Sequence, residues 1–477
     1  MLFNSPVFIF IFLPFVLLVY FFLNKLKISL GKSWLVVVSL FFYGYWNIDY
    51  IILIIISILC NYGLGKFLIK LNNGTEKYTL LSKSILIKGI IFNLVILFYY
   101  KYTDFIITNV NYIFEVEISM LNLLLPLAIS FFTFQQIAYL VDCYKSDALE
   151  YNFLNYCLFV TFFPQLIAGP IVHHKEMMPQ FNKQINANVN HANLAKGLFI
   201  FAIGLFKKVI IADSFAQWAN TGFSSATVLQ FWDAWGASLS YTFQLYYDFS
   251  AYADMAIGVA LMFNIVLPIN FNSPYKALTI QDFWHRWHMT LSRWLRDYLY
   301  IPLGGNRKGA IRTYINVMLT FILGGLWHGA AWTFIVWGAL HGLALCTQRL
   351  WTQVGFKLPS IISWLLTFTF INVSWIFFRA EDIPSALHII SGMLGANGYN
   401  TSSILIAPGN TLITSPYIVS YLIIFGFSAF FSRNSMELSL NKIRYTIWDS
   451  LMVSAVFFLA ILFGIATVDS EFLYFNF

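Results

Sequence analysis

The chain has 477 residues, of which 59% are hydrophobic and 10% are charged, and it carries a formal net charge of +7. Its 28 Lys+Arg and 21 Asp+Glu side chains are too few to coat a water-facing surface of this size, and its 50 phenylalanines exceed what one soluble core can bury. This composition excludes a cytosolic enzyme, a disordered chain, a nucleic-acid-binding protein and a disulfide scaffold. It predicts an all-α polytopic membrane protein, because helices satisfy their backbone groups within lipid.

The N-terminal part contains apolar runs whose flanking loops alternate in charge. The first run, Ser5–Leu23, is followed by three lysines rather than by a small-residue cleavage site. This pattern predicts a retained first span with its N-terminus outside. Further spans are predicted at about Ser33–Trp46, Ile51–Ile69, Ile85–Tyr100 and Leu121–Val141.

The rest of the chain adds apolar segments of uneven length, so we expect about ten to thirteen crossings, some of them short or broken. Acidic residues after the last segment and basic residues before it predict that the C-terminus also lies outside. The later segments lie near Tyr151–Ile171, Leu194–Ala212, Ala237–Leu267, Ile311–Leu326, Ala331–Cys346, Ile361–Phe378, Leu412–Phe431 and Trp448–Ala466.

Two regions do not fit simple spans. Gly169–Asn193 and Asn270–Arg312 are too polar to face lipid and too aromatic to be free loops. Interfacial or re-entrant helices that line a water-filled cavity would suit both regions. We therefore expect one transmembrane domain over residues 1–477, with N-terminal spans in 1–145, a core in 146–350, and C-terminal spans with a short external tail in 351–477.

Polar groups at membrane depth are the first candidates for chemistry. His328 lies in Gly324–Trp332 (GGLWHGAAW), where glycines leave room beside the imidazole and Trp327 and Trp332 can shield it from lipid. The alternative is a packed histidine bonded to a neighbouring helix. His341 follows 13 residues later, about 220° around a continuous helix. The two histidines cannot share one site unless the helix breaks, so we expect His341 to be structural.

A second cluster lies in Asp282–Asp297 (DFWHRWHMTLSRWLRD). His285 and His288 are three residues apart, which predicts one helical face, and Asp282–Arg286 and Arg293–Asp297 have the spacing of intrahelical ion pairs. The alternative is a basic helix lying on cytoplasmic headgroups.

The acidic residue Asp248 lies in a long apolar segment and needs a partner, for which Arg286 or Arg293 is the expected candidate. No metal site is predicted, because the paired histidines lack a third ligand at helical spacing. Motifs for ATP, dinucleotides or a serine nucleophile are also missing from the sequence.

Several motifs together resemble the membrane-bound O-acyltransferase (MBOAT) family, in its bacterial branch of alginate and peptidoglycan O-acetyltransferase-like proteins. Asp282–Arg307 carries the most specific likeness, although His285 stands where arginine is expected. The other matching stretches are Leu166–Ile171 (LIAGPI), Pro179–Phe181 (PQF), Tyr247–Ser250 (YDFS), Asn272–Tyr275 (NSPY), Trp327–Gly329 (WHG) and Trp337–Gly342 (WGALHG).

The resemblance implies that His328 is the catalytic histidine, with His288 as its companion, in a bundle with a central tunnel between inner and outer funnels. It implies transfer of an acyl group from a cytoplasmic thioester, acetyl-CoA or an acyl carrier protein, with no bound cofactor. Cationic residues between Arg286 and Lys308, including Arg293 and Arg296, would hold the phosphates of the donor. Asp248 and Asp282 would support this site.

The resemblance also implies an acetyl relay at the tail. Tyr474, in Phe472–Phe477 (FLYFNF), would accept acetyl in the outer funnel and pass it to an extracytoplasmic O-acetyltransferase partner. The alternative is an aromatic interfacial anchor. The expected function is O-acetylation of an envelope polysaccharide, alginate or another exopolysaccharide or peptidoglycan, from the bacterial inner membrane. D-alanyl transfer to teichoic acid and, in a different class, a transporter or flippase are the alternatives.

Overall fold

The computed structural model describes residues 1–72, 79–145, 152–167, 169–224, 228–399, 418–440, 446–466 and 472–473. These residues form two compact units; two of the boundaries between them fall within helices, and a third follows Pro268 in a non-helical segment. We call Met1–Phe201 with Met255–Pro268 the first unit, and Ala202–Asp254 with Ile269–Phe475 the second unit. The candidate site residues that the structure describes all belong to the second unit.

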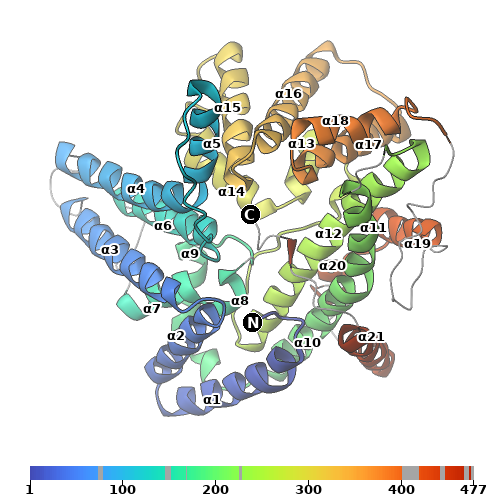
Figure 1. Cartoon of the computed structure of the whole chain (residues 1–477). Coiled ribbons are helices and arrows are strands. Elements are labelled where there is room, and N and C mark those ends of the chain that lie inside the picture. Colours follow the sequence, from blue (N-terminus) through green and yellow to red (C-terminus); the bar gives the residue numbers. More distant parts are fainter. Residues whose placement is uncertain are drawn as a thin grey trace. The chain divides into compact units, whose positions relative to one another are not determined.

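The first unit is built from helices of 4 to 24 residues, most of them apolar (Figure 1). Buried amides link two of its helices, since Asn61 and Asn93 donate to each other at 3.1 and 2.6 Å. The helices are α1 (Leu13–Leu26), α2 (Ile28–Gly44), α3 (Asp49–Asn72), α4 (Leu80–Lys101), α5 (Thr103–Phe114), α6 (Ile129–Tyr144), α7 (Phe153–Thr161), α8 (Phe163–Leu166), α9 (His174–Met177) and most of α10 (His191–Phe206).

The second unit begins at the end of α10, where the π-helical turn Lys207–Ala212 continues the helix. Its remaining helices are α11 (Asp213–Phe223), α12 (Phe231–Met262), α13 (Ile280–Arg286), α14 (Met289–Leu295), α15 (Ala310–His328), α16 (Trp332–Val354), α17 (Ser360–Arg379), α18 (Ile383–Met393), α19 (Ile418–Phe431), α20 (Ser435–Leu440) and α21 (Ile447–Ala466).

Six helices in the described part of the chain are long and apolar enough to cross a membrane. They begin at Phe8, Asp49, Leu80, Ala310, Ser360 and Ile447. Three shorter apolar helices add to them, and the described residues contain no strand. The predicted class, an all-α multi-pass membrane protein, is therefore confirmed. The total number of crossings stays a prediction.

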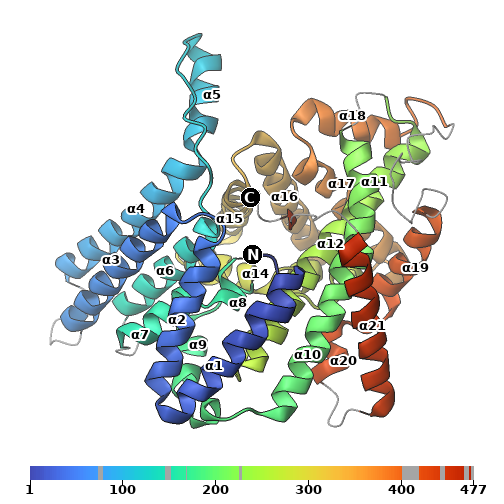
Figure 2. The same cartoon turned by 60° about the horizontal axis from the view of Figure 1, so that its bottom comes forward.

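Some predicted spans differ from the helices that form. The run Leu121–Val141 is helical only from Ile129, because Pro126 lacks a backbone donor and Ala128 adopts a left-handed conformation (φ 60°). The run Tyr151–Ile171 breaks at Phe162 into α7 and α8. In the loop predicted after α4, the chain forms α5, which projects beyond α4 (Figure 2).

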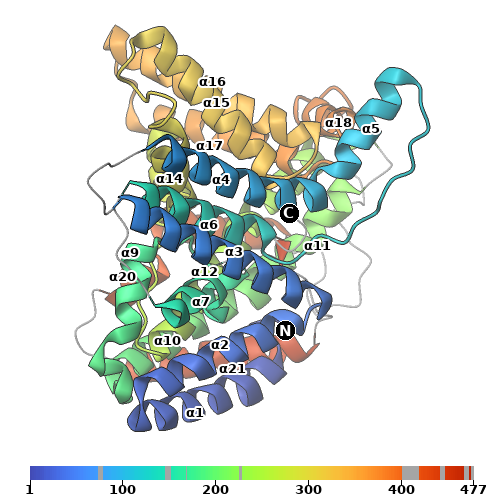
Figure 3. The ribbon, with the colours of Figure 1, turned by 90° about the vertical axis from the view of Figure 1, so that its left-hand side faces the viewer.

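Glycines set the distance between α15 and α16, which lie side by side (Figure 3). A Cβ on Gly325 would come within 2.2 Å of the Phe334 carbonyl oxygen, and a Cβ on Gly338 within 2.3 Å of the Phe321 carbonyl oxygen. Only glycine permits this backbone approach. The contact holds the end of α15, and with it His328, against the aromatic side chains of α16.

Candidate functional site

His328 is the last residue of α15 and is only 3% exposed. Three aromatic rings surround its imidazole in edge-to-face contacts. The ring centroids of Trp327, Trp337 and Phe378 lie 4.9, 5.2 and 5.1 Å away. An imidazole in such surroundings is largely shielded from bulk solvent, which strengthens its electrostatic interactions with any bound polar group.

His288 lies in the link between two short helices, not on a helical face. Helix α13 ends at Arg286 and α14 begins at Met289, and His288 itself adopts a left-handed conformation with φ 42°. The prediction that His285 and His288 share one helical face is therefore wrong. The break turns His285 outward to an exposed position, while His288 is 0% exposed.

Asn270 fixes the tautomer of His288. The Asn270 Oδ1 atom accepts from the Thr290 backbone N–H at 3.3 Å, which identifies it as the amide oxygen. The Nδ1 atom of His288 lies 3.2 Å from the same oxygen and must therefore donate to it. This leaves the lone pair of the neutral imidazole on Nε2. Burial lowers the pKa of His288 to about 3, so the ring is neutral at physiological pH.

Trp327 brings the two histidines together. Its ring centroid lies 4.9 Å from that of His328 and 6.5 Å from that of His288. On its other side, His288 contacts Phe249 of α12, with ring centroids 4.8 Å apart. Residues 40 positions apart in the sequence thus share one aromatic cluster in the second unit.

His341 is held as a structural residue. The Trp284 indole N–H donates to His341 Nδ1 at 3.2 Å, which requires the proton of the neutral ring to lie on Nε2. The Nε2–H group of His341 donates to Ser374 Oγ at 3.1 Å, and the serine hydroxyl donates in turn to the Ile371 carbonyl. Both ring nitrogens therefore have partners, in a residue that is 0% exposed.

A cavity of about 410 Å³ is lined by two arginines of the segment Asp282–Asp297. Arg293, Arg296 and His285 line it together with Ser292 and Thr320. Its apolar wall consists of Trp284, Met289, Leu295, Val317, Phe321 and Leu345. A cavity that combines two guanidinium groups with an apolar wall suits a ligand with phosphate groups and a short apolar arm. We call it the arginine cavity.

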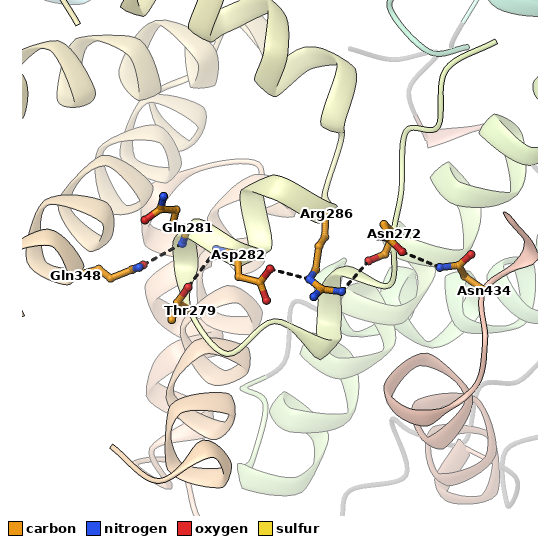
Figure 4. A network of polar contacts seen from close by, with 7 residues as sticks. All are labelled: Asn272, Thr279, Gln281, Asp282, Arg286, Gln348 and Asn434. Carbon is orange, nitrogen blue, oxygen red and sulfur yellow. Dashed lines mark hydrogen bonds and ion pairs between the residues drawn. The ribbon is translucent and has the colours of Figure 1, made fainter. Parts of the chain in front are cut away.

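Arg286 does not line this cavity. Figure 4 shows its contacts with Asp282 and Asn272. Its Nε lies 2.8 Å from Asp282, which confirms the predicted intrahelical ion pair, and its Nη1 donates to the Asn272 carbonyl. The Asn434 amide donates to the Asn272 side chain at 3.0 Å. Asp282 and Arg286 thus brace α13 against the extended segment before it. The second predicted pair is wrong, because Asp297 pairs with its neighbour Arg296.

Asp248 pairs with Lys208, not with Arg286 or Arg293 as predicted. Lys208 Nζ lies 2.8 Å from an oxygen of Asp248 and 2.8 Å from an oxygen of Asp213. The side chains of Lys208 and Asp248 are 5% and 2% exposed. The sequence favours an arginine partner because Lys208 lies in an apolar run, whereas the arginines lie in a polar region. Two consecutive lysines within Leu194–Ala212 were the signal that an intramembrane carboxylate had a partner there.

The other oxygen of Asp248 accepts from the backbone N–H of Leu473 at 3.0 Å. The preceding residue, Phe472, is 1% exposed and stacks on Tyr252, with ring centroids 4.4 Å apart. Phe472 also contacts Phe249, the ring that packs on His288. The described end of the tail therefore docks on α12 beside the histidine cluster. The predicted relay, Tyr474, lies outside the described residues.

Two buried donors of the cluster were not anticipated from the sequence. Among the residues that the structure describes, no acceptor lies within hydrogen-bonding distance of Trp337 Nε1 or Asn270 Nδ2. Trp337 packs on His328, and Asn270 bonds to His288. Buried donors of this kind normally have partners, so both are candidates to bind a substrate oxygen. The described residues also contain no group of three potential metal ligands.

One buried histidine ends a helix that is long and apolar enough to span a membrane, and the other lies in the link between two short helices. Such a pair is a candidate catalytic centre, and the comparisons with known proteins specify its class. The pattern of the membrane-bound O-acyltransferase family, MBOAT, matches residues 144–380. This range includes both histidines and the arginine cavity.

The similar proteins are acyltransferases. The peptidoglycan O-acetyltransferase of Helicobacter pylori is 52% identical over 429 residues, which cover 83% of this chain and 80% of that protein. The probable alginate O-acetylase AlgI of Pseudomonas aeruginosa is 37% identical over 91% of this chain and 83% of its own length. The teichoic acid D-alanyltransferase of Bacillus subtilis is 28% identical over 54% of this chain and 70% of its own length.

The chain belongs to the membrane-bound O-acyltransferase family. It is an acyltransferase, and the family and enzyme class predicted from the sequence are confirmed.

Proposed function

We propose that the chain transfers acetyl groups from a cytoplasmic thioester across the bacterial inner membrane, for O-acetylation of an extracytoplasmic polysaccharide. The observation that carries this proposal is the meeting of two buried imidazoles at Trp327. The relatives named for O-acetylation of peptidoglycan and alginate indicate the acceptor class. Their alignments cover more of this chain than that of the D-alanyltransferase, which favours acetyl as the transferred group.

In the proposed reaction, His328 is the general base. A ring nitrogen takes the proton of the acceptor hydroxyl while the hydroxyl oxygen attacks the thioester carbonyl carbon. When the carbon–sulfur bond of the tetrahedral intermediate breaks, the imidazolium returns the proton to the leaving sulfur. General-base catalysis of this kind contributes about 10²–10⁴-fold to the rate. His288, neutral and oriented by Asn270, is the companion that presents Nε2 to the reacting groups.

The two buried donors, Trp337 Nε1 and Asn270 Nδ2, would stabilise the tetrahedral intermediate by hydrogen bonds. The negative charge that develops on the carbonyl oxygen needs hydrogen-bond donors that are already in place. Trp337 Nε1 and Asn270 Nδ2 are buried, and each belongs to a residue in contact with one of the two histidines. We propose that they donate to this oxygen.

The arginine cavity is the proposed donor site. Arg293 and Arg296 would bind the phosphates of coenzyme A or of the arm of an acyl carrier protein, because guanidinium groups bind phosphate through paired hydrogen bonds. Asp282 and Arg286 would act indirectly, because their ion pair fixes α13, which supplies Trp284 and His285 to the cavity wall.

The tail is the proposed exit for acetyl. The Tyr474 phenol would accept acetyl as an ester and pass it to an extracytoplasmic partner that modifies the polymer. The docking of Phe472 and Leu473 on α12 supports this role, because it fixes the preceding residues beside Phe249 and His288. Asp248 would then be a positioning residue for the tail.

A complementation experiment tests the proposed function. Cells that lack this chain would be given the wild type or His328→Ala, and ester-linked acetate would be released by mild alkali from purified peptidoglycan and exopolysaccharide. The wild type restores acetate on one polymer, and the variant, present in the membrane in equal amount, does not. Full restoration by His328→Ala would overturn the role of His328. No acetate on any polymer with the wild type would overturn the proposed acceptor class.

A further inference from the structure

A groove of about 760 Å³ lies between α16 and α17, away from the histidine cluster. Its volume is within the range of sites that bind small ligands. One wall runs from Leu340 to Trp351 on α16, and the other runs from Ser360 to Phe370 on α17. Residues 278–280, at the start of α13, form the remaining side.

The length of the groove matches one leaflet of a bilayer. The ten helical steps from Ser360 to Phe370 rise by about 15 Å in an α-helix. This is half of the hydrocarbon core, which is about 30 Å thick. Because α17 is one of the six helices long and apolar enough to span a membrane, its first half would lie within one leaflet of a bilayer that it crosses.

Polarity changes along the groove. At the end near Phe370, the lining consists of Leu340, Leu343, Ala344, Leu366 and Phe370. The one hydroxyl at this depth, that of Thr367, already donates to the Leu278 carbonyl at 3.0 Å. The deep end therefore offers an apolar surface that fits a hydrocarbon chain.

The opposite end is polar and cationic. It is lined by Thr347, Gln348, Ser360, Ser363 and Lys357. Lys357 is the only charged side chain among the described residues that line the groove. Trp351 and Phe356 stand beside this end, with ring centroids 5.7 Å apart. Aromatic residues next to a lysine are typical of the membrane–water interface.

We propose that this groove is a binding site for one phospholipid with an anionic headgroup. The acyl chain would lie along Leu343, Leu366 and Phe370, and the phosphate would lie at Lys357. The positive charge of Lys357 favours an anionic headgroup. A length equal to one leaflet favours a lipid over a soluble ligand.

The lipid would also contact the segment that begins α13. Gln348 of the groove accepts from the Gln281 backbone N–H at 2.9 Å, and Thr279 caps the same helix by accepting from the Asp282 N–H (Figure 4). Gln281 itself lines the arginine cavity. The lipid would thus support a helix shared by both sites, although the proposed binding does not depend on the transfer reaction.

The test measures lipid retained by the full-length chain. The protein, purified in detergent, would be exchanged against phosphatidylglycerol or phosphatidylcholine, and retained lipid would be counted by native mass spectrometry. We expect one retained phosphatidylglycerol. The Lys357→Glu variant lowers the preference for phosphatidylglycerol by about fivefold or more, as expected for an interfacial cation. Lys27→Glu, at an exposed lysine of the first unit, leaves the preference unchanged.

A second pair of variants tests the groove itself. Ala344→Trp fills the lining and abolishes retention, whereas Leu350→Trp, at an exposed position of α16 outside the lining, does not. Equal retention of the two lipids by the wild type overturns the proposal. So does retention that Ala344→Trp leaves unchanged, or a stable dimer of the chain that excludes lipid from the groove.

Discussion

The buried ion cluster of Lys208, Asp213 and Asp248 gives the sharpest prediction on stability. Replacing Lys208 by methionine keeps most of the apolar stem but removes the cation that lies 2.8 Å from both carboxylates. The Asp248 side chain is 2% exposed, so water cannot replace the lost partner. The variant must therefore either keep an uncompensated buried charge or protonate a carboxyl group.

The expected loss follows from this geometry. Removing one partner of a buried ion pair costs about 3–5 kcal/mol. Asp213 is more accessible, with 13% of its side chain exposed, so Asp248 should account for most of the loss. The double variant Lys208→Met/Asp248→Asn has no charge at position 248, and the amide oxygen introduced there can still accept from the Leu473 N–H. We expect the double variant to recover at least half of the loss.

The assay is unfolding of the purified chain in mixed micelles, followed by the fluorescence of its 15 tryptophans. Lys208→Met, Asp248→Asn and the double variant form a double-mutant cycle. Lys25→Met, at an exposed lysine, is the control and should change the free energy of unfolding by less than about 0.5 kcal/mol. If Lys208→Met costs no more than Lys25→Met, or if the double variant loses the sum of the single losses, the assigned ion cluster is refuted.

Three further predictions concern the histidines and the arginine cavity. The pKa of His288 is about 3 in the folded chain and about 6.5 in the unfolded chain, so the unfolded chain binds more protons between these two pH values. The free energy of unfolding should therefore fall as the pH drops from 6.5 toward 3, and it should fall less in His288→Asn. Equal slopes of the free energy of unfolding against pH in the wild type and the variant would refute the burial of His288. His341→Ala leaves the Trp284 N–H and Ser374 without their partner and should cost about 1–3 kcal/mol in stability, with transfer per folded molecule retained; loss of transfer at full stability would contradict the structural role. Arg293→Gln should raise KM for the thioester donor at least about tenfold with kcat little changed, as measured by thiol release, whereas an unchanged KM would remove Arg293 from the donor site.

Much of the fold and part of the site could be predicted from the sequence. Apolar runs predicted the long helices, because lipid demands continuous hydrophobic segments. Glycine and tryptophan around residue 328 indicated an imidazole held among aromatic rings, and the four-residue spacing of Asp282 and Arg286 predicted their ion pair. These features are local, so the sequence carries them directly.

The contacts that the sequence did not reveal join distant or irregular segments. Asn270 bonds to His288 because the chain leaves helical geometry between α13 and α14. His288 adopts a left-handed backbone conformation there, which the sequence would normally signal by a glycine. Lys208 pairs with Asp248, which lies 40 positions later on the next long helix. Neither helical periodicity nor residue spacing specifies such pairings, which depend on how the helices pack.

The most direct test of the proposed chemistry is a comparison of transfer rates in proteoliposomes that contain the wild-type chain or His328→Asn. The acetyl thioester donor would be supplied in excess, with the acetyl acceptor present, and release of free thiol would be followed over time. Since His328 is proposed as the general base, we expect His328→Asn to lower kcat by about 10²-fold or more while the variant unfolds at a similar denaturant concentration. A kcat within about twofold of the wild type would contradict this role.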